Sequence, residues 1–136
     1  MTRFAIDPET LVHLAGDSRS VNPVHQLVAP NSIRSLALNI LLQRVRNAEL
    51  SEREAVAQHE RMTEIKIRLL GDRVSRRTAW QLALEKDLNA LEFAEYVAVA
   101  SLQADALVTF NPELATIASG LVPLAKLTDL FAQYST

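Results

Sequence analysis

Short hydrophobic runs along the chain alternate with longer stretches in which apolar residues recur at helical spacing. Residues 3–7 (RFAID) predict a strand that ends in an acid, and residues 106–110 (ALVTF) predict another with little alternation. Unbroken apolar runs of this length are typical of strands covered on both faces of a parallel sheet. We expect two further short strands at residues 25–29 and 121–124.

The stretches between these strands carry helix signals. We expect helices from Pro8 to about Ala15, from Ser32 to Ala48, from Glu52 to Ile67, from Arg76 to Leu84, from Glu92 to about Gln103, from Pro112 onward and from Thr128 to Tyr134. The helix from Glu92 is apolar around most of its circumference and is expected to be buried, and Trp80 is expected on the inner side of the helix before it. Strands that alternate with helices predict one α/β domain over residues 1–136, with a mainly parallel sheet of about four short strands.

Composition places the chain among globular proteins: 49% of the 136 residues are apolar and 22% are charged. No window approaches the ~20 apolar residues of a membrane span, and the N-terminus has no signal-peptide pattern, so we expect a cytoplasmic protein with no membrane partner. The absence of cysteine excludes disulfides, thiolate zinc sites and a cysteine nucleophile. The three glycines form neither a dinucleotide-binding fingerprint nor a P-loop.

The net charge of −2 hides an uneven distribution. Residues 44–77 carry nine Lys and Arg against six Asp and Glu, whereas residues 85–136 carry two against seven. A basic middle could attract an anionic polymer, and Arg73, Arg76 and Arg77 are its candidate RNA contacts. The alternative is a solvated helix face with i,i+4 ion pairs, which a pI near 5.9 favours.

Four segments occur in an order that resembles the PIN-domain family, in particular its VapC toxin branch. They are ID at the end of the first strand, AP before a long helix, AW-x-LA, and AEYVAVASLQADALVTFNPELA, and together they span residues 3 to about 130. The resemblance implies a three-layer α/β/α fold. It also implies a Mg²⁺- or Mn²⁺-dependent endoribonuclease that a small antitoxin protein usually holds in check.

The resemblance further implies a cluster of acids at the strand ends. Hard divalent cations require oxygen ligands, and the metal would polarise the phosphate and generate hydroxide from water. Asp7 stands where the first family acid is expected. The other three acids fall on Leu36, Phe93 and Asn111, of which only Asn111 offers an oxygen.

Substitute acids lie close by in the sequence. Glu92 and Glu95, three residues apart, share one helix face, so the candidate metal ligands are Asp7, Glu95 and Glu92, and the candidate catalytic residues are Asp7, Asn111 and Glu95. Asp7 and Asn111 each have a structural alternative, because each precedes a proline that can open a helix and can serve as its N-cap.

With three of four acids replaced, we expect nuclease activity to be weak or absent. The alternative is a catalytically inactive fold that binds RNA or an antitoxin-like helix, or that serves in oligomerisation, with a homodimer as the expected state.

Overall fold

The computed structural model describes residues 1–131, and its centre is a sheet of five strands. In spatial order the strands are β3 (Arg68–Leu70), β2 (Gln26–Pro30), β1 (Arg3–Ile6), β4 (Ala106–Val108) and β5 (Leu124–Ala125). Every neighbouring pair is parallel. The α/β prediction is confirmed, with one strand more than expected.

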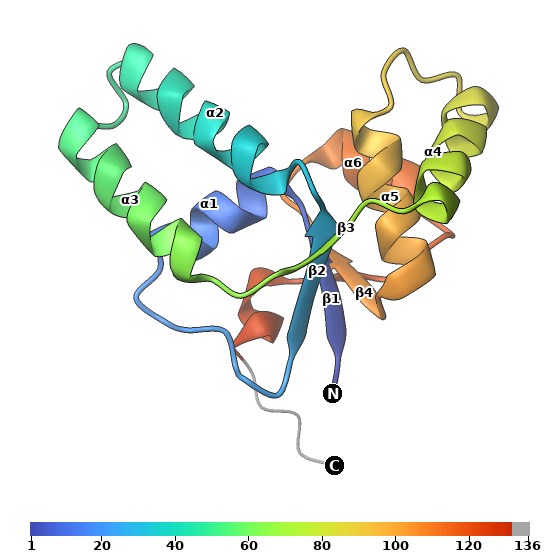
Figure 1. The fold of residues 1–136 in the computed structure, drawn as a ribbon, viewed down its shortest axis with the longest axis horizontal. Coiled ribbons are helices and arrows are strands. Elements are labelled where there is room, and N and C mark those ends of the chain that lie inside the picture. The colour runs from blue at the N-terminus through green and yellow to red at the C-terminus, as the bar shows by residue number, and fades with distance from the viewer. Residues whose placement is uncertain (132–136) are drawn as a thin grey trace.

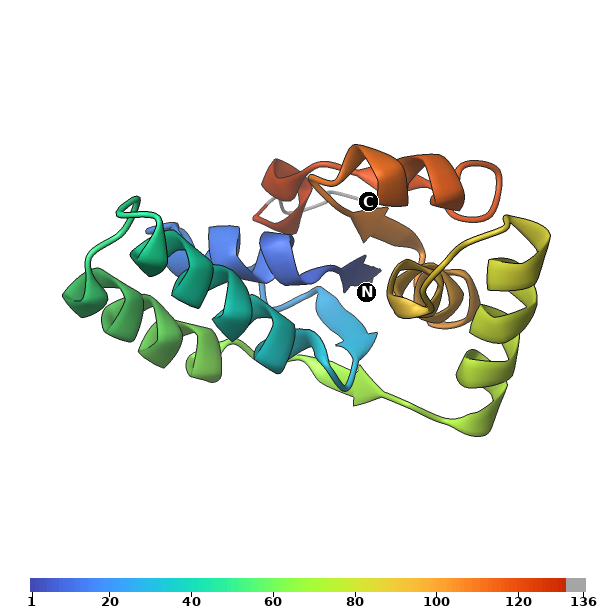
Figure 2. The ribbon, with the colours of Figure 1, turned by 90° about the horizontal axis from the view of Figure 1, so that it is seen from above.

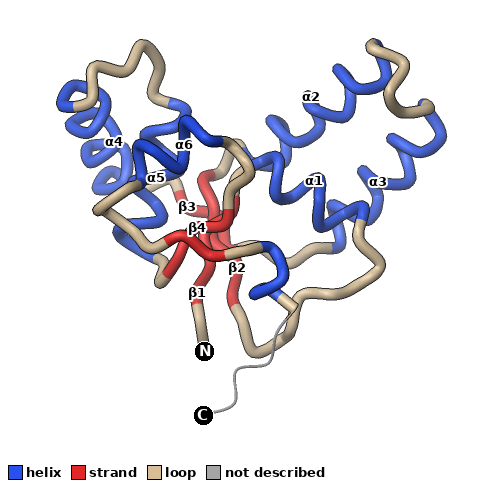
Figure 3. The backbone as a smooth tube through the Cα atoms, turned by 180° about the vertical axis from the view of Figure 1, so that it is seen from behind, coloured by secondary structure: helices blue, strands red, loops and turns tan. Residues whose placement is uncertain are grey.

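Helices cover both faces of this sheet. They are α1 (Pro8–Gly16), α2 (Ile33–Arg46), α3 (Glu52–Glu64), α4 (Arg73–Glu85), α5 (Glu92–Gln103), α6 (Pro112–Ala118) and the short 3-10 helix η1 (Leu127–Leu130). Figures 1 and 2 show α1, α2 and α3 on one side of the strands and α4, α5 and α6 on the other. Figure 3 shows the strands between the two groups from behind. The result is a three-layer α/β/α arrangement.

The order in which the chain visits the strands explains this division. After β1, the chain adds β2 and β3 in one direction, then returns to the other side of β1 for β4 and β5. Parallel crossovers are almost always right-handed, so reversing the direction moves the connecting helices to the opposite face. The reversal falls between β1 and β4, and ligands bind outside the carboxyl ends of parallel strands at such a switch point.

The apolar α5 lies against the sheet, as its sequence predicts. Its buried residues are Ala94, Tyr96, Val97, Ala98, Val99 and Ala100. Tyr96 is among the largest fully buried side chains of the described chain, together with Phe4 and Ile6 of β1. Each fully buried aliphatic or aromatic side chain of this size contributes about 1.5–3 kcal/mol to stability, so the β1–α5 contact anchors the domain.

The sequence prediction misses β3 and shifts two helix ends. β3 has only three residues, of which Arg68 and Leu69 are exposed, so no apolar run marks it. It is a strand because it pairs with the end of β2. α3 accordingly ends at Glu64 and not at Ile67.

α4 begins three residues earlier than predicted, at Arg73. Ser75, the residue before the predicted start, lies inside the helix, and Asp72 is the N-cap because its carboxylate accepts the Ser75 N–H at 2.8 Å. Trp80 was expected on the inner side of α4, and this prediction is wrong: its side chain is 57% exposed. The buried face of α4 consists of Ser75, Ala79, Leu82 and Ala83, of which all but Leu82 are small. These residues bring α4 close to α5, and the Trp80 side chain lies beside this buried face and is open to solvent.

The C-terminal elements are shorter than predicted. The last strand occupies Leu124–Ala125, because Leu121 and Val122 are still bonded to Ala118 in the turn that ends α6. Where we expected a helix from Thr128, the 3-10 helix η1 is present, and the rest of that expected helix lies outside the described residues. No helix within residues 1–131 combines the length and the apolar character that crossing a membrane requires.

Candidate functional site

The pocket at the topological switch point is the strongest candidate for a functional site. It has a volume of about 530 Å³ and lies at the carboxyl ends of β1 and β4, between the starts of α1, α5 and α6. Its lining residues are Asp7, Pro8, Glu9, Leu36, Asn39, Ile40, Glu92, Phe93, Tyr96, Phe110, Asn111, Pro112 and Leu114. Most of these side chains are hydrophobic, and three are acids.

Four positions singled out by the sequence meet in this pocket. Asp7, Leu36, Phe93 and Asn111 stand where the resemblance expects acids, and all four line it. They come from the end of β1, from α2, from the first turn of α5 and from the cap of α6. Residues that are 29, 57 and 18 positions apart are therefore brought together by the fold.

Asp7 is held by hydrogen bonds and is nearly inaccessible, with 3% exposure. Its Oδ1 accepts the Thr10 N–H at 2.8 Å and the Thr10 hydroxyl at 2.6 Å, which makes it the N-cap of α1. Its Oδ2 accepts the Thr109 hydroxyl at 2.5 Å. A carboxylate offers about four lone-pair directions, and three of them are occupied here. The structural alternative for Asp7 is confirmed.

Asn111 also serves as a helix cap. Its Oδ1 accepts the N–H groups of Glu113 at 2.9 Å and Leu114 at 3.2 Å, at the start of α6. Its own N–H donates to Oγ1 of Thr109 at 3.0 Å. The chain of bonds from Asn111 through Thr109 to Asp7 joins the two helix starts across β1 and β4.

The other acids of the region separate into two places. Glu92 and Glu9 line the pocket, and Glu9 forms an ion pair with Arg44 and lies 3.5 Å from Nε2 of His13. Glu95 lines a neighbouring, smaller pocket of about 160 Å³ at the ends of β2 and β3, together with Arg76. Three residues along α5 are enough to direct Glu92 and Glu95 into different cavities.

These residues do not fit a Mg²⁺ or Mn²⁺ centre. Among the described residues, no three His, Cys, Asp or Glu side chains gather closely enough to hold a metal ion. Hard-cation sites require several convergent carboxylate or carbonyl oxygens. Here Leu36 and Phe93 contribute carbon atoms, and the oxygens of Asp7 and Asn111 are already bonded to the backbone and to threonines.

Sequence reasoning did not single out Tyr96, Thr10 or Thr109 for this site. Tyr96 lines the pocket, and its hydroxyl lies 3.4 Å from the Ser32 hydroxyl. Burial raises the pKa of the Tyr96 phenol, and the carboxylates of Glu92, Asp7 and Glu95 raise it further, against a lowering by the Ser32 contact. The phenol is therefore a neutral hydrogen-bonding group at neutral pH. Thr10 could have been anticipated, since it stands three residues after the predicted cap Asp7.

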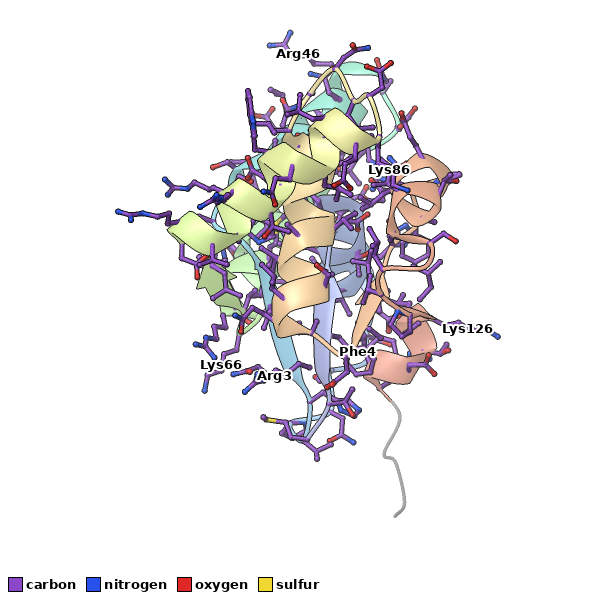
Figure 4. The ribbon with its side chains drawn as sticks, turned by 90° about the vertical axis from the view of Figure 1, so that its right-hand side faces the viewer. Arg3, Phe4, Arg46, Lys66, Lys86 and Lys126 are labelled. Atoms are coloured by element: carbon purple, nitrogen blue, oxygen red, sulfur yellow. The ribbon has the colours of Figure 1, made fainter. Side chains whose placement is uncertain are left out.

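The three arginines predicted as candidate RNA contacts differ in their hydrogen bonding. Arg76 donates to the Gly71 carbonyl at 2.7 Å, whereas Arg73 and Arg77 are exposed on the outer face of α4. Figure 4 shows Arg46 at the top of the molecule and Lys66 near its lower end, so the cations of residues 44–77 are spread along the molecule.

Comparison with solved structures supports the fold. The crystal structure of PAE2754 from Pyrobaculum aerophilum superposes with a TM-score of 0.69, over 96% of this chain and 93% of that one, at 20% sequence identity. Neither protein-family models nor curated proteins give a match to the sequence. At this identity the likeness establishes the three-layer architecture alone.

Proposed function

We propose that this chain is a PIN-like domain in which the metal-dependent nuclease centre has been replaced by a hydrogen-bonded, partly apolar pocket, and that it acts by binding a partner. One observation carries the proposal. Asp7, Leu36, Phe93 and Asn111, where the family resemblance expects four acids, line the same pocket at the strand ends. This convergence supports the resemblance, and the identity of the side chains opposes metal-dependent cleavage.

A second groove supports a binding role. It lies between α2 and α3, has a volume of about 720 Å³ and is lined mainly by aliphatic side chains. Among these, Leu38, Leu42 and Val56 are 44–55% exposed. Apolar side chains at helical spacing in a groove suit the apolar face of an amphipathic helix, such as one from an antitoxin-like protein.

A residual ribonuclease is the second candidate, and the position of Glu92 favours it. Glu92 and Glu9 line the same pocket as Asp7, so they are the candidate substitute ligands. Glu9, however, is already paired with Arg44. In this candidate Asp7 and Glu92 would hold Mg²⁺ or Mn²⁺, which would supply a Lewis acid and a bound hydroxide.

The deciding experiment rebuilds the acidic cluster. We expect no Mn²⁺-dependent cleavage of a structured RNA by the natural chain, and no rise in its melting temperature with Mn²⁺. The triple variant Leu36→Glu, Phe93→Asp, Asn111→Asp should gain a Mn²⁺-dependent rise in melting temperature, because it places four carboxylates around one pocket. Asp7→Asn, added to the triple variant, should remove most of this gain.

The outcomes separate the two candidates. Cleavage by the natural chain that requires Mn²⁺ and is lost in Asp7→Asn would establish the residual nuclease. A triple variant that remains folded but does not respond to Mn²⁺ would show that the four positions do not form a metal site, and the PIN-like proposal would fail. For the groove, Leu42→Glu should abolish binding of a small protein encoded beside this chain's gene, and Leu84→Glu on α4 should leave it intact.

A further inference from the structure

The smaller pocket at the carboxyl ends of β2 and β3 differs in chemistry from the pocket at the switch point. It has a volume of about 160 Å³ and is lined by residues of the turn before α2, of the first turns of α4 and of α5. Figure 1 shows the segment from β3 to α4 passing in front of α5. We call this cavity the β2–β3 pocket. Its apolar walls are Pro30, Leu70 and Val99, and its longer polar side chains are Asn31, Arg76 and Glu95.

One positive and one negative side chain line the β2–β3 pocket without pairing with each other. Arg76 donates one N–H to the Gly71 carbonyl at 2.7 Å, which leaves most of its N–H groups open. Glu95 is half-buried, and its carboxylate forms no hydrogen bond or ion pair within residues 1–131. A charged group that loses water without gaining a partner is costly, so this carboxylate is suited to a partner from outside the chain.

A third polar group, the side-chain amide of Asn31, reaches the pocket across Gly71. The two residues are so close that a Cβ on residue 71 would lie 2.1 Å from Nδ2 of Asn31. The amide forms no hydrogen bond inside the described part of the chain. It therefore offers both a donor and an acceptor to a ligand, beside the cation and the anion.

The volume of the pocket restricts the size of that ligand. A water molecule occupies about 30 Å³ of the liquid, so 160 Å³ holds about five waters, or a molecule of roughly five to seven non-hydrogen atoms. A nucleotide or a segment of a peptide is larger than this. The aliphatic walls suit a single methyl or methylene group.

We propose that the β2–β3 pocket binds a small zwitterion, namely a free α-amino acid of the size of glycine or alanine. Its carboxylate contacts Arg76, and its ammonium group contacts Glu95. The opposite charges of the ligand then match the opposite charges that line one cavity. A guanidinium can hold a carboxylate through two parallel N–H bonds, and the methyl group of alanine contacts the aliphatic walls.

The exposure of the polar groups sets the expected affinity. Arg76 and Asn31 are exposed, so water competes for their hydrogen bonds and weakens the charge pairs. We expect a dissociation constant on the order of a millimolar. Because this site is separate from the pocket at the switch point, the proposal does not depend on the function proposed above.

Calorimetric titration of the full chain with L-alanine up to tens of millimolar tests the site. L-alanine and glycine should bind. Propionate and ethylamine each carry only one of the two charges, so each should bind at least ~10-fold more weakly. Trimethylglycine keeps both charges but has no N–H to donate to Glu95, and it should also bind more weakly than glycine. No binding of L-alanine, or equal binding of L-alanine and propionate, would overturn the proposal.

Conservative variants test the two charged contacts. Glu95→Gln and Arg76→Gln should each weaken L-alanine binding at least ~10-fold, because each removes one charge from the pocket. Arg76→Lys keeps the positive charge and should lose less affinity than Arg76→Gln. Arg77→Gln, at the next position of α4 and outside the pocket, is the matched control and should bind like the natural chain. Equal melting temperatures without ligand verify that the variants fold.

Two results with these variants would refute the β2–β3 pocket as the site. The first is L-alanine binding that neither Glu95→Gln nor Arg76→Gln weakens. The second is loss of binding in Glu92→Gln with retention in Glu95→Gln, which would assign the ligand to the pocket at the switch point.

Discussion

Replacing Asp7 by alanine should destabilise the domain even when no divalent cation is present. The structure assigns two separate losses to this change. α1 loses its N-cap bond to the Thr10 N–H, which costs about 1 kcal/mol. The Thr109 hydroxyl loses a charged acceptor, which costs about 1.5–3 kcal/mol.

Two further contacts adjust this total. The Thr10 hydroxyl retains a partner, because the Val108 carbonyl lies 3.0 Å away. Removing a carboxylate that is only 3% exposed also relieves part of its desolvation cost. The net loss is about 2–3 kcal/mol, and in a domain of 136 residues this lowers the melting temperature by roughly 8 °C.

Thermal unfolding in EDTA measures this loss, with Asp7→Asn as the matched variant. Asparagine caps helices about as well as aspartate and keeps an oxygen acceptor, so it should lose only about 1 kcal/mol. The expected order of melting temperatures is the natural chain, then Asp7→Asn, then Asp7→Ala. If the Asp7 carboxylate served only as a metal ligand, Asp7→Ala would not lower the melting temperature in EDTA, because without metal its removal costs no stability or relieves charge repulsion. If Asp7→Ala melts at or above the natural temperature in EDTA, the structural role assigned to Asp7 is wrong.

Tyr96 and Gly71 each support one further prediction. Burial raises the folded-state pKa of Tyr96 above its ordinary value of 10.0, so the neutral phenol stabilises the fold fully below pH 10. Above pH 10 this contribution is lost, and the free energy of unfolding should fall by up to about 1.4 kcal/mol per pH unit. Denaturant unfolding at alkaline pH should show this slope in the natural chain and a shallower one in Tyr96→Phe; equal slopes would contradict the assignment. Gly71→Ala should cost less than about 1 kcal/mol, because a Cβ there would lie 2.1 Å from Nδ2 of Asn31, which is the end of an exposed side chain that can rotate away. A double-mutant cycle with Asn31→Ala should recover most of that cost, and strict additivity would place the strain elsewhere.

The sequence predicts well those elements whose own residues carry the signal. β1, β4 and α5 are buried on most sides, so their composition is apolar enough to mark them. Asp7 and Asn111 cap α1 and α6 as their prolines indicate. β3 carries no such signal, because an exposed three-residue edge strand is defined by its bonds to β2 and not by its side chains.

Trp80 shows a second kind of limit. Apolar residues occur on nearly every side of α4, so their spacing does not select a buried face, and a large aromatic ring is the natural choice for the core. Packing selects the small face instead, with Ala79 and Ala83 toward α5. For the candidate site, the sequence predicts which residues lie near the strand ends but not where their side chains point. Glu92 and Glu95 are predicted to act together, yet their side chains leave the helix at different angles and line different pockets.

The position of β1 has a consequence for how the protein is made. β1 comes first in chain order among the five strands, yet it lies at the centre of the sheet, and the Arg3 N–H bonds to the Asp105 carboxylate, 102 residues later. Contacts of such long sequence separation form slowly. A nascent chain that has not yet extended past residue 108 can pair β1 only with β2, and its other edge stays open to pairing with a different molecule. The ribosome must therefore synthesise the chain through Val108 before the sheet can close around β1, and until then the open edge of β1 can pair with a chaperone or with another chain.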